Sequence, residues 1–221
     1  MIILDNMKGI PMSDLKIGRI VLSMCQTNCY FVYREGEKKV MLFDPADNGA
    51  YIKQALSGKG FEISAILLTH GHFDHIWGCS ELRQLTGAEV YALDMEEDVL
   101  LSSKLNSSEA AGRACTVKAN HLVKDCDILS LLDFSIKVLA TPGHTKGSCC
   151  YYFEKEKVLI SGDTLFLESV GRTDLPTGSM GELTRSIREK LSPLPDEVVV
   201  YPGHGDSTTI GHERNYNPFW N

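Results

Sequence analysis

The sequence predicts an α/β domain in which two mixed β-sheets pack face to face and helices cover their outer surfaces. Two observations lead to this fold class. Each half of the chain contains several short segments rich in β-branched and aromatic residues, and helical segments follow them. The 221 residues, 43% of them hydrophobic, suffice for one core, and no repeat or low-complexity linker divides them. We therefore expect a single domain over residues 1–221.

The first half of the chain begins with strands. Alternating apolar residues between turn signals predict three of them, at Leu15–Leu22, Cys29–Arg34 and Lys39–Phe43. A polar turn joins the last two, so an early antiparallel sheet follows. A helix is expected at Asn48–Leu56. The short apolar run Ile63–Leu68 is typical of a strand that is buried on both faces.

The middle of the chain predicts helices at Ile76–Leu85, closed by Gly87, and at Met95–Leu105, with a strand at Glu89–Leu93 between them. Residues 106–119 are polar and small, which indicates a loop or a weak helix. The second half predicts a helix at Ser179–Leu191 and five strands, at Ile128–Leu131, Phe134–Ala140, Cys149–Phe153, Val158–Ser161 and Val198–Tyr201.

Charge and composition exclude several classes of partner. The net charge is −7 and no basic run is present, so we expect no nucleic-acid binding. No apolar run is long enough to cross a bilayer, and Met1–Ile10 lacks the pattern of a signal peptide. The seven cysteines are odd in number and follow no disulfide framework, which favours a cytoplasmic protein.

Residues 69–75, Thr-His-Gly-His-Phe-Asp-His, are the centre of the functional prediction. His70, His72, Asp74 and His75 are all ligand types that zinc prefers. Side chains alternate along an extended loop, so His70 and His72 point to one metal ion, while Asp74 and His75 turn towards a second. The alternative is a polar loop in which Asp74 caps a helix and the imidazoles are solvated.

Three further donors each follow a predicted strand in a turn that contains glycine. They are His144 in Thr-Pro-Gly-His-Thr, Asp163 in Ser-Gly-Asp-Thr and His204 in Pro-Gly-His-Gly. Jointly these segments predict a metal centre at the edge of a sheet layer. Cys25 and Cys29 could form a redox or zinc pair, but the sequence has no second cysteine pair that would complete such a site. His121 and His212 lie outside the ligand pattern.

These motifs together resemble the metallo-β-lactamase superfamily and, within it, the glyoxalase II-like hydrolases. The resemblance extends over nearly the whole chain, to residues 208–213. It implies an αββα sandwich with two divalent metal ions per chain, zinc first and iron or manganese as alternatives. By the same resemblance, the first ion is held by His70, His72 and His144, the second by Asp74, His75 and His204, and Asp163 bridges both.

The expected activity is hydrolysis of a small-molecule thioester or a related activated acyl compound. Two cations lower the pKa of a shared water, so that metal-bound hydroxide attacks the carbonyl. No Gly-x-Ser-x-Gly motif supplies another nucleophile. Asp74 has a second, catalytic role, because it orients the hydroxide while it ligates.

Substrate recognition is expected in the segment after Asp163. In glyoxalase II enzymes a basic residue and a tyrosine there contact glutathione. Arg172 keeps the basic role in this chain, and Asp174 stands where the tyrosine would be. Alternatively, Arg172 pairs with Asp174 on the surface. The C-terminal helical extension of those enzymes is missing, so the thiol carrier stays open, as does the oligomeric state.

Two other classes of function remain. Residues 171–174, Gly-Arg-Thr-Asp, also resemble persulfide dioxygenases, which use one iron held by two histidines and an aspartate on the same fold. A non-catalytic metal-binding scaffold is the other alternative. Within the hydrolases, lactonase and nuclease chemistry stay open, although the acidic net charge disfavours a nuclease.

Overall fold

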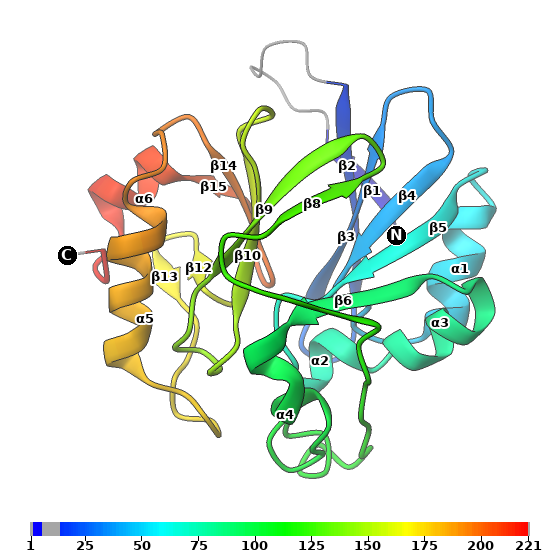
Figure 1. Ribbon diagram of the computed structural model, residues 1–221, viewed down its shortest axis with the longest axis horizontal. Coiled ribbons are helices and arrows are strands. Elements are labelled where there is room, and N and C mark those ends of the chain that lie inside the picture. The colour runs from blue at the N-terminus through cyan, green and yellow to red at the C-terminus, as the bar shows by residue number, and fades with distance from the viewer. Residues whose placement is uncertain (1, 6–13, 221) are drawn as a thin grey trace.

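Two β-sheets packed face to face form the centre of the computed structural model, which describes residues 2–5 and 14–220 (Figure 1). The first sheet has seven strands, ordered β1 (Ile2–Asp5), β2 (Leu15–Leu22), β3 (Thr27–Arg34), β4 (Lys39–Phe43), β5 (Glu62–Leu67), β6 (Glu89–Leu93) and β7 (His121–Val123). Neighbours from β1 to β4 are antiparallel, and those from β4 to β7 are parallel. The sheet is therefore mixed, as expected.

The second sheet has six strands, ordered β15 (Thr208–Thr209), β14 (Val199–Pro202), β11 (Val158–Gly162), β10 (Cys149–Phe153), β9 (Phe134–Ala140) and β8 (Ile128–Leu131). Only β11 and β14 are parallel among its pairs. A small separate hairpin, β12 (Leu165–Phe166) and β13 (Ser169–Val170), follows β11 along the chain.

Helices cover the outer face of each sheet (Figure 1). The first sheet is covered by α1 (Gly49–Ser57) and α3 (Cys79–Thr86), and the second by α5 (Met180–Ser186), the π-helical turn η2 (Ile187–Leu191) and α6 (Ile210–Tyr216). The short elements α2 (Phe73–Ile76), η1 (Asp94–Glu96) and α4 (Glu97–Leu100) lie near one end of the sheets.

Strand β4 shows how the sequence pattern builds these layers. Met41 and Phe43 face the second sheet and pack in the core between the sheets, whereas Val40 and Leu42 face the helices. Successive side chains of a strand point to opposite faces, so this wholly apolar run is buried on both sides. The predicted αββα sandwich is confirmed.

Six strand predictions match their observed bounds, but two helix predictions are wrong. The helix expected at Ile76–Leu85 is broken into α2 and α3. Gly78 packs against the chain at the break, where a Cβ would lie 2.8 Å from the carbonyl oxygens of Pro45 and Asp47. The helix expected at Met95–Leu105 ends at Leu100.

Side chains after Leu100 compete with the helix for hydrogen bonds. Asn106 Nδ2 donates to the Cys115 carbonyl, and Ser108 Oγ donates to the same oxygen. Polar side chains that bond the backbone offer it an alternative to helix. The segment expected as loop or weak helix, residues 106–119, is accordingly a loop with turns in its first half.

The elements that sequence patterns did not predict are short. They include β7, β12, β13, β15 and the seven-residue α6. Periodicity carries little information over two to seven residues. No helix in the described ranges has the length and apolar character needed to cross a membrane. Of the N-terminal segment Met1–Ile10, only residues 2–5 lie within the described part.

Candidate metal centre

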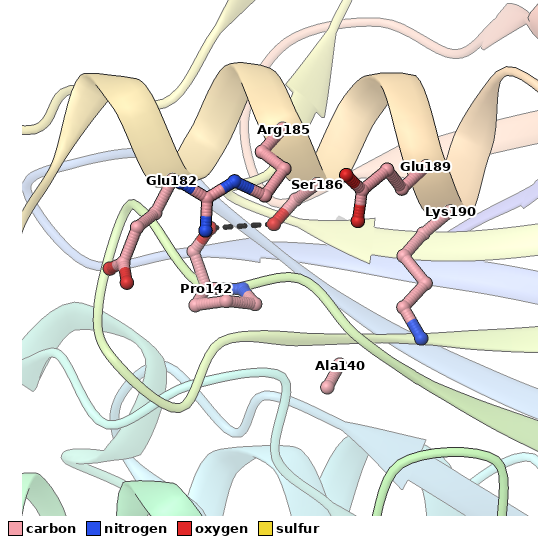
Figure 2. Close-up of a pocket in the computed structure, with 7 residues that line it drawn as sticks. All are labelled: Ala140, Pro142, Glu182, Arg185, Ser186, Glu189 and Lys190. Atoms are coloured by element: carbon pink, nitrogen blue, oxygen red, sulfur yellow. Dashed lines mark hydrogen bonds between the residues drawn. The ribbon is translucent and has the colours of Figure 1, made fainter.

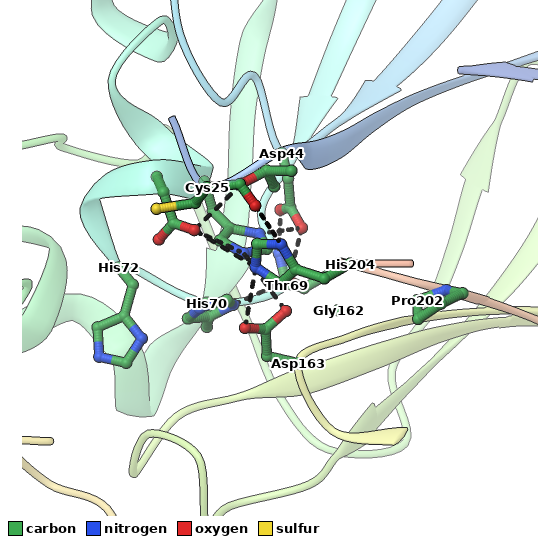
Figure 3. A network of polar contacts seen from close by, with 12 residues as sticks. Cys25, Asp44, Thr69, His70, His72, Gly162, Asp163, Pro202 and His204 are labelled. Atoms are coloured by element: carbon green, nitrogen blue, oxygen red, sulfur yellow. Dashed lines mark hydrogen bonds and ion pairs between the residues drawn. The ribbon is translucent and has the colours of Figure 1, made fainter. Parts of the chain in front are cut away.

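The structure brings all seven predicted donors together at one edge of the two sheets. Figure 3 labels His70, His72, Asp163 and His204 among them. The seven donors follow β5, β9, β11 and β14 along the chain, most of them in loops, with Asp74 and His75 in the short helix α2. His70, His72, His75 and His144 are each at most 2% exposed. Buried imidazoles that meet from distant loops are typical of ligands, not of solvated turn residues.

Asp74 does not cap a helix. The N-cap of α2 is His72, in an extended conformation, and no side chain makes a capping hydrogen bond there. Asp74 lies inside α2 and its Oδ2 accepts a hydrogen bond from Thr27 Oγ1 at 3.1 Å. The alternative of a solvated, helix-capping loop is therefore wrong.

The first cluster consists of three imidazole nitrogens. His144 Nε2 lies 2.7 Å from His72 Nδ1 and 3.2 Å from His70 Nε2. Two nitrogens bound to one tetrahedral zinc at 2.0–2.1 Å lie about 3.3 Å apart, so this spacing is close to that of a coordination shell. Burial, reinforced by His144, lowers the pKa of His72 to about 3, and the pKa values of His70 and His144 are lowered too. Three neutral imidazoles thus direct lone pairs at one point.

Backbone carbonyls orient two of the histidine rings. His144 Nδ1 donates to the Arg172 carbonyl at 2.7 Å, and His204 Nδ1 donates to the Cys25 carbonyl at 3.1 Å. A ring that donates from Nδ1 in this way presents Nε2 to the site.

Helix α5 holds the loop that carries His144 from behind. A Cβ at Gly143 would lie 2.3 Å from the Leu183 nitrogen, so only glycine permits this approach. Ser186 Oγ donates to the Pro142 carbonyl at 2.7 Å (Figure 2). The pocket in that figure is lined by Ala140, Pro142, Glu182, Arg185, Ser186, Glu189 and Lys190 and contains none of the predicted donors.

Asp44 is a buried carboxylate that the sequence reasoning missed. Its Oδ2 accepts hydrogen bonds from His75 Nδ1 at 2.9 Å and from Thr69 Oγ1 at 2.7 Å, and the Thr69 oxygen lies 3.1 Å from His70 Nδ1. Asp44, His70 and His75 also form a possible donor group, but the nitrogens facing Asp44 and Thr69 are those that point away from the site. Asp44 therefore orients a histidine of each cluster.

The second cluster combines Asp74, His75 and His204. Asp74 Oδ2 lies 3.4 Å from His204 Nε2 and 3.8 Å from His75 Nε2, and the two nitrogens are 3.4 Å apart. Burial disfavours charge here, but the two carboxylates, Asp163 and Asp74, outweigh it and raise the pKa of His204 to about 9 and that of His75 well above its usual value. Against the same burial, the cationic His75 lowers the pKa of Asp74 to about 2.

Asp163 lies between the two clusters. Its Oδ2 is 3.5 Å from His144 Nε2 and 3.4 Å from His204 Nε2, and its Oδ1 is 3.4 Å from His75 Nε2. Oδ1 is buried and makes no hydrogen bond. A buried carboxylate oxygen without a hydrogen bond fits a bridging ligand. The donor set as a whole fits a pair of divalent cations.

Arg172 and Asp174 form a bidentate ion pair at the surface. Arg172 Nε and Nη2 each donate to the Asp174 carboxylate at 2.7 Å, and the two side chains are 62% and 68% exposed. The pairing that the sequence left open is therefore present. Only the backbone of Arg172 contacts a predicted donor, His144.

The two histidines outside the ligand pattern lie apart from the donors. His121 pairs with Glu89, and His212 pairs with Glu168. Cys25 and Cys29 form no disulfide, and Cys29 is buried in the core beneath the helices of the first sheet.

The fold and the donor set together define an αββα protein with a candidate metal centre. The chain belongs to the metallo-β-lactamase superfamily, whose family model matches residues 22–204. Among its relatives, the probable metallo-hydrolase YqgX of Bacillus subtilis is 39% identical over 94% of this chain and 98% of its own. The hydroxyacylglutathione hydrolase GloC of Haemophilus influenzae is 32% identical over 94% and 99%.

Solved structures agree with this assignment. The crystal structure of the BLEG-1 B3 metallo-β-lactamase is 41% identical, with a TM-score of 0.87, and covers 92% of this chain and 99% of its own. TTHA1623 in a di-iron-bound form is 32% identical, with a TM-score of 0.81, over 91% and 98%. ETHE1 from Myxococcus xanthus is 28% identical, with a TM-score of 0.71, over 90% and 82%.

Proposed function

We propose that this protein is a metal-dependent hydrolase of thioesters, similar to hydroxyacylglutathione hydrolases. The observation that carries the proposal is the arrangement of all seven donors in two clusters with Asp163 between them. The similarity to GloC and to YqgX over nearly the whole chain supports it.

One cation would be held by His70, His72 and His144, and a second by Asp74, His75 and His204, with Asp163 contacting both. We propose zinc as the metal, and the di-iron form of TTHA1623 keeps iron as an alternative beside manganese. A pair of divalent cations supplies a water of lowered pKa and polarises the carbonyl that this water attacks.

The residues around the cations orient the reactants. We propose that Asp74 is the catalytic carboxylate, because its low pKa keeps it ionised and able to accept a hydrogen bond from the attacking water. Thr27 donates to the same oxygen and restrains the carboxylate.

A protein nucleophile is disfavoured at this site. Cys25 lies beside Asp74, and burial together with that carboxylate raises the pKa of its thiol. Because the thiolate is the nucleophilic form of cysteine, this shift makes Cys25 a weaker nucleophile at neutral pH. Attack by water fits these surroundings better than a covalent acyl-enzyme.

We propose that Arg172 and Asp174 contact the substrate at the mouth of the site. The Arg172 carbonyl bonds a ring of the first cluster, so its loop lies next to that cluster. The bidentate pair leaves Arg172 Nη1 without a bond to Asp174, and it can bind a substrate carboxylate. The seven cysteines are all free, which fits a cytoplasmic enzyme acting on a small-molecule thioester.

A persulfide dioxygenase is the second candidate, supported by the Gly-Arg-Thr-Asp run at residues 171–174 and by the similarity to the ETHE1 structure. Such an enzyme needs one iron on two histidines and an aspartate. The second cluster here, Asp74, His75 and His204, is buried or half-buried and complete. It favours the two-cation hydrolase.

Elemental analysis and a substrate screen test the proposal together. We expect about two ions per chain and hydrolysis of S-lactoylglutathione, with lactone, β-lactam and glutathione persulfide as the other arms. Asp74→Asn should abolish turnover, whereas Asp206→Asn, at an 82% exposed carboxylate close to His204 in sequence, should not. One tightly bound iron, oxygen uptake with persulfide and no hydrolysis would replace the proposal with the dioxygenase.

A further inference from the structure

The Glu96 side chain lies behind the first cluster and is not one of the seven donors. It is 1% exposed and ends η1. Its Oε1 accepts a hydrogen bond from Gly71 N at 2.7 Å, and its Oε2 accepts from Thr145 Oγ1 and Gly147 N, both at 2.9 Å. Three donors therefore converge on one buried carboxylate.

These donors belong to the two loops that supply every ligand of the first cluster. Gly71 stands between His70 and His72, and Thr145 directly follows His144. The loops are more than 70 residues apart in sequence. Glu96 thus joins the two loops close to the point where their imidazoles meet.

A carboxylate is the group that this position requires. Burying a charge is unfavourable unless hydrogen bonds offset the cost, so a purely structural position would favour an apolar side chain. A carboxylate accepts on both oxygens, whereas the amide of glutamine places an N–H₂ against a donor on one side. The contact is also rigid, since a Cβ at Gly147 would lie 2.2 Å from the Glu96 nitrogen.

We propose that Glu96 is a positioning residue that sets the spacing of these two loops and so the affinity of the first cluster for its cation. This inference rests on the proposed function only in requiring that the cluster binds a cation. Loss of the carboxylate lets the His144 loop move relative to the loop of His70 and His72, while the second cluster keeps its geometry.

The test compares Glu96→Gln with Asp98→Asn, an exposed acid of the neighbouring α4 that pairs with Lys146 of the His144 loop. Zinc affinities at both sites are measured by competition with a chromophoric chelator. We expect Glu96→Gln to weaken the first site about 10–100-fold, the usual range when a hydrogen-bond partner of a ligand shell is lost, and to leave the second unchanged. Asp98→Asn should keep both parental affinities.

Ligand variants identify the affected site. In a His204→Ala background, where the first cluster is the intact one, adding Glu96→Gln should weaken the remaining ion about 10–100-fold. In a His144→Ala background it should change nothing. Weakening in both backgrounds, or only in the second, would overturn the proposal.

A merely structural role gives a different result, namely a lower unfolding temperature of the metal-free protein with both zinc affinities unchanged. If Glu96→Gln does not fold, Thr145→Val removes one donor and keeps the carboxylate, and it should weaken the first site alone; an unchanged affinity would refute the positioning role. A parent that binds no ion overturns this inference and the proposed function together. A parent that binds two ions but cleaves no thioester overturns only the function.

Discussion

Replacing Asp44 with asparagine exchanges one carboxylate oxygen for an amide nitrogen, and we expect this change to perturb both clusters. Three donors converge on this carboxylate, since Thr69 N bonds Oδ1 at 2.8 Å while Thr69 Oγ1 and His75 Nδ1 bond Oδ2. Asparagine has one acceptor oxygen, so either the Thr69 amide or the His75 ring loses its partner. Asp44 has a positive φ of 50°, a conformation that asparagine also tolerates, and backbone strain therefore does not confound the change.

The expected loss follows from these bonds. One buried donor without a partner costs about 1–3 kcal/mol of stability, and each kcal/mol lowers the unfolding temperature of a chain this size by about 2–4 °C. A ring that is no longer oriented weakens metal binding about 10–100-fold. The second cluster should lose more affinity than the first, because His75 contacts Asp44 directly and His70 only through Thr69.

Chelator competition on the metal-free protein measures both affinities, and thermal unfolding of the same samples measures stability. Asp47→Asn is the matched control, because it removes one charge three residues away, where the carboxylate bonds Arg113 and the Asn48 amide. Parental affinities at both sites together with a parental unfolding temperature in Asp44→Asn would refute this reasoning. A lower unfolding temperature with parental affinities would mean that the Thr69 amide, and not the His75 ring, lost its partner.

Three further predictions follow from the site. Zinc entering the second cluster at pH 7 should release protons, because the raised pKa values of His75 and His204 keep both rings protonated, whereas the first cluster should release none. The zinc affinity of the second site then falls as pH falls from about 9, roughly tenfold per pH unit for each displaced proton. Calorimetry in buffers of different ionisation enthalpy counts the protons that are released. Equal release at both sites would contradict the pKa directions. Arg172→Ala should raise the KM for a carboxylate-bearing thioester about tenfold, the low end for a charged hydrogen bond at an exposed site, and leave metal content unchanged, because the contact with His144 uses only the backbone; loss of metal would argue against a substrate role. Adding zinc at about 100 times its dissociation constant should stabilise the metal-free protein by about 2.7 kcal/mol per site, which raises its unfolding temperature by roughly 5–11 °C. Thermal scans at several zinc concentrations measure this shift, and an unfolding temperature that does not depend on zinc concentration would contradict it.

The seven donors could be predicted because their pattern is local. Each follows an apolar strand or stands in a turn that contains glycine, and the strands of two packed sheets bring their ends to one edge. The segment Phe43-Asp44-Pro45 carries the same signal, an acid directly after an apolar strand, but Asp44 was not singled out from the sequence.

Other features depend on contacts that no local pattern contains. The helix after residue 75 breaks because Gly78 meets the Pro45–Asp47 backbone from another part of the chain. Glu96 stands in a polar stretch, Asp-Met-Glu-Glu-Asp, where acids are normally solvated. Its burial follows from the approach of Gly147, which the sequence of residues 94–98 cannot indicate.

Asp44 and Glu96 hold different parts of the metal centre in place. Asp44 fixes which nitrogen of two rings faces inwards, and Glu96 joins the loops whose rings must meet. Each is a carboxylate at most 2% exposed, and apolar replacement of buried charged groups is often neutral or stabilising. Fold stability alone therefore does not favour acids at these positions, whereas the donors that converge on them require acceptor oxygens. The metal centre thus extends beyond its seven donors to a surrounding layer whose chemistry is set by the ligands and not by the core.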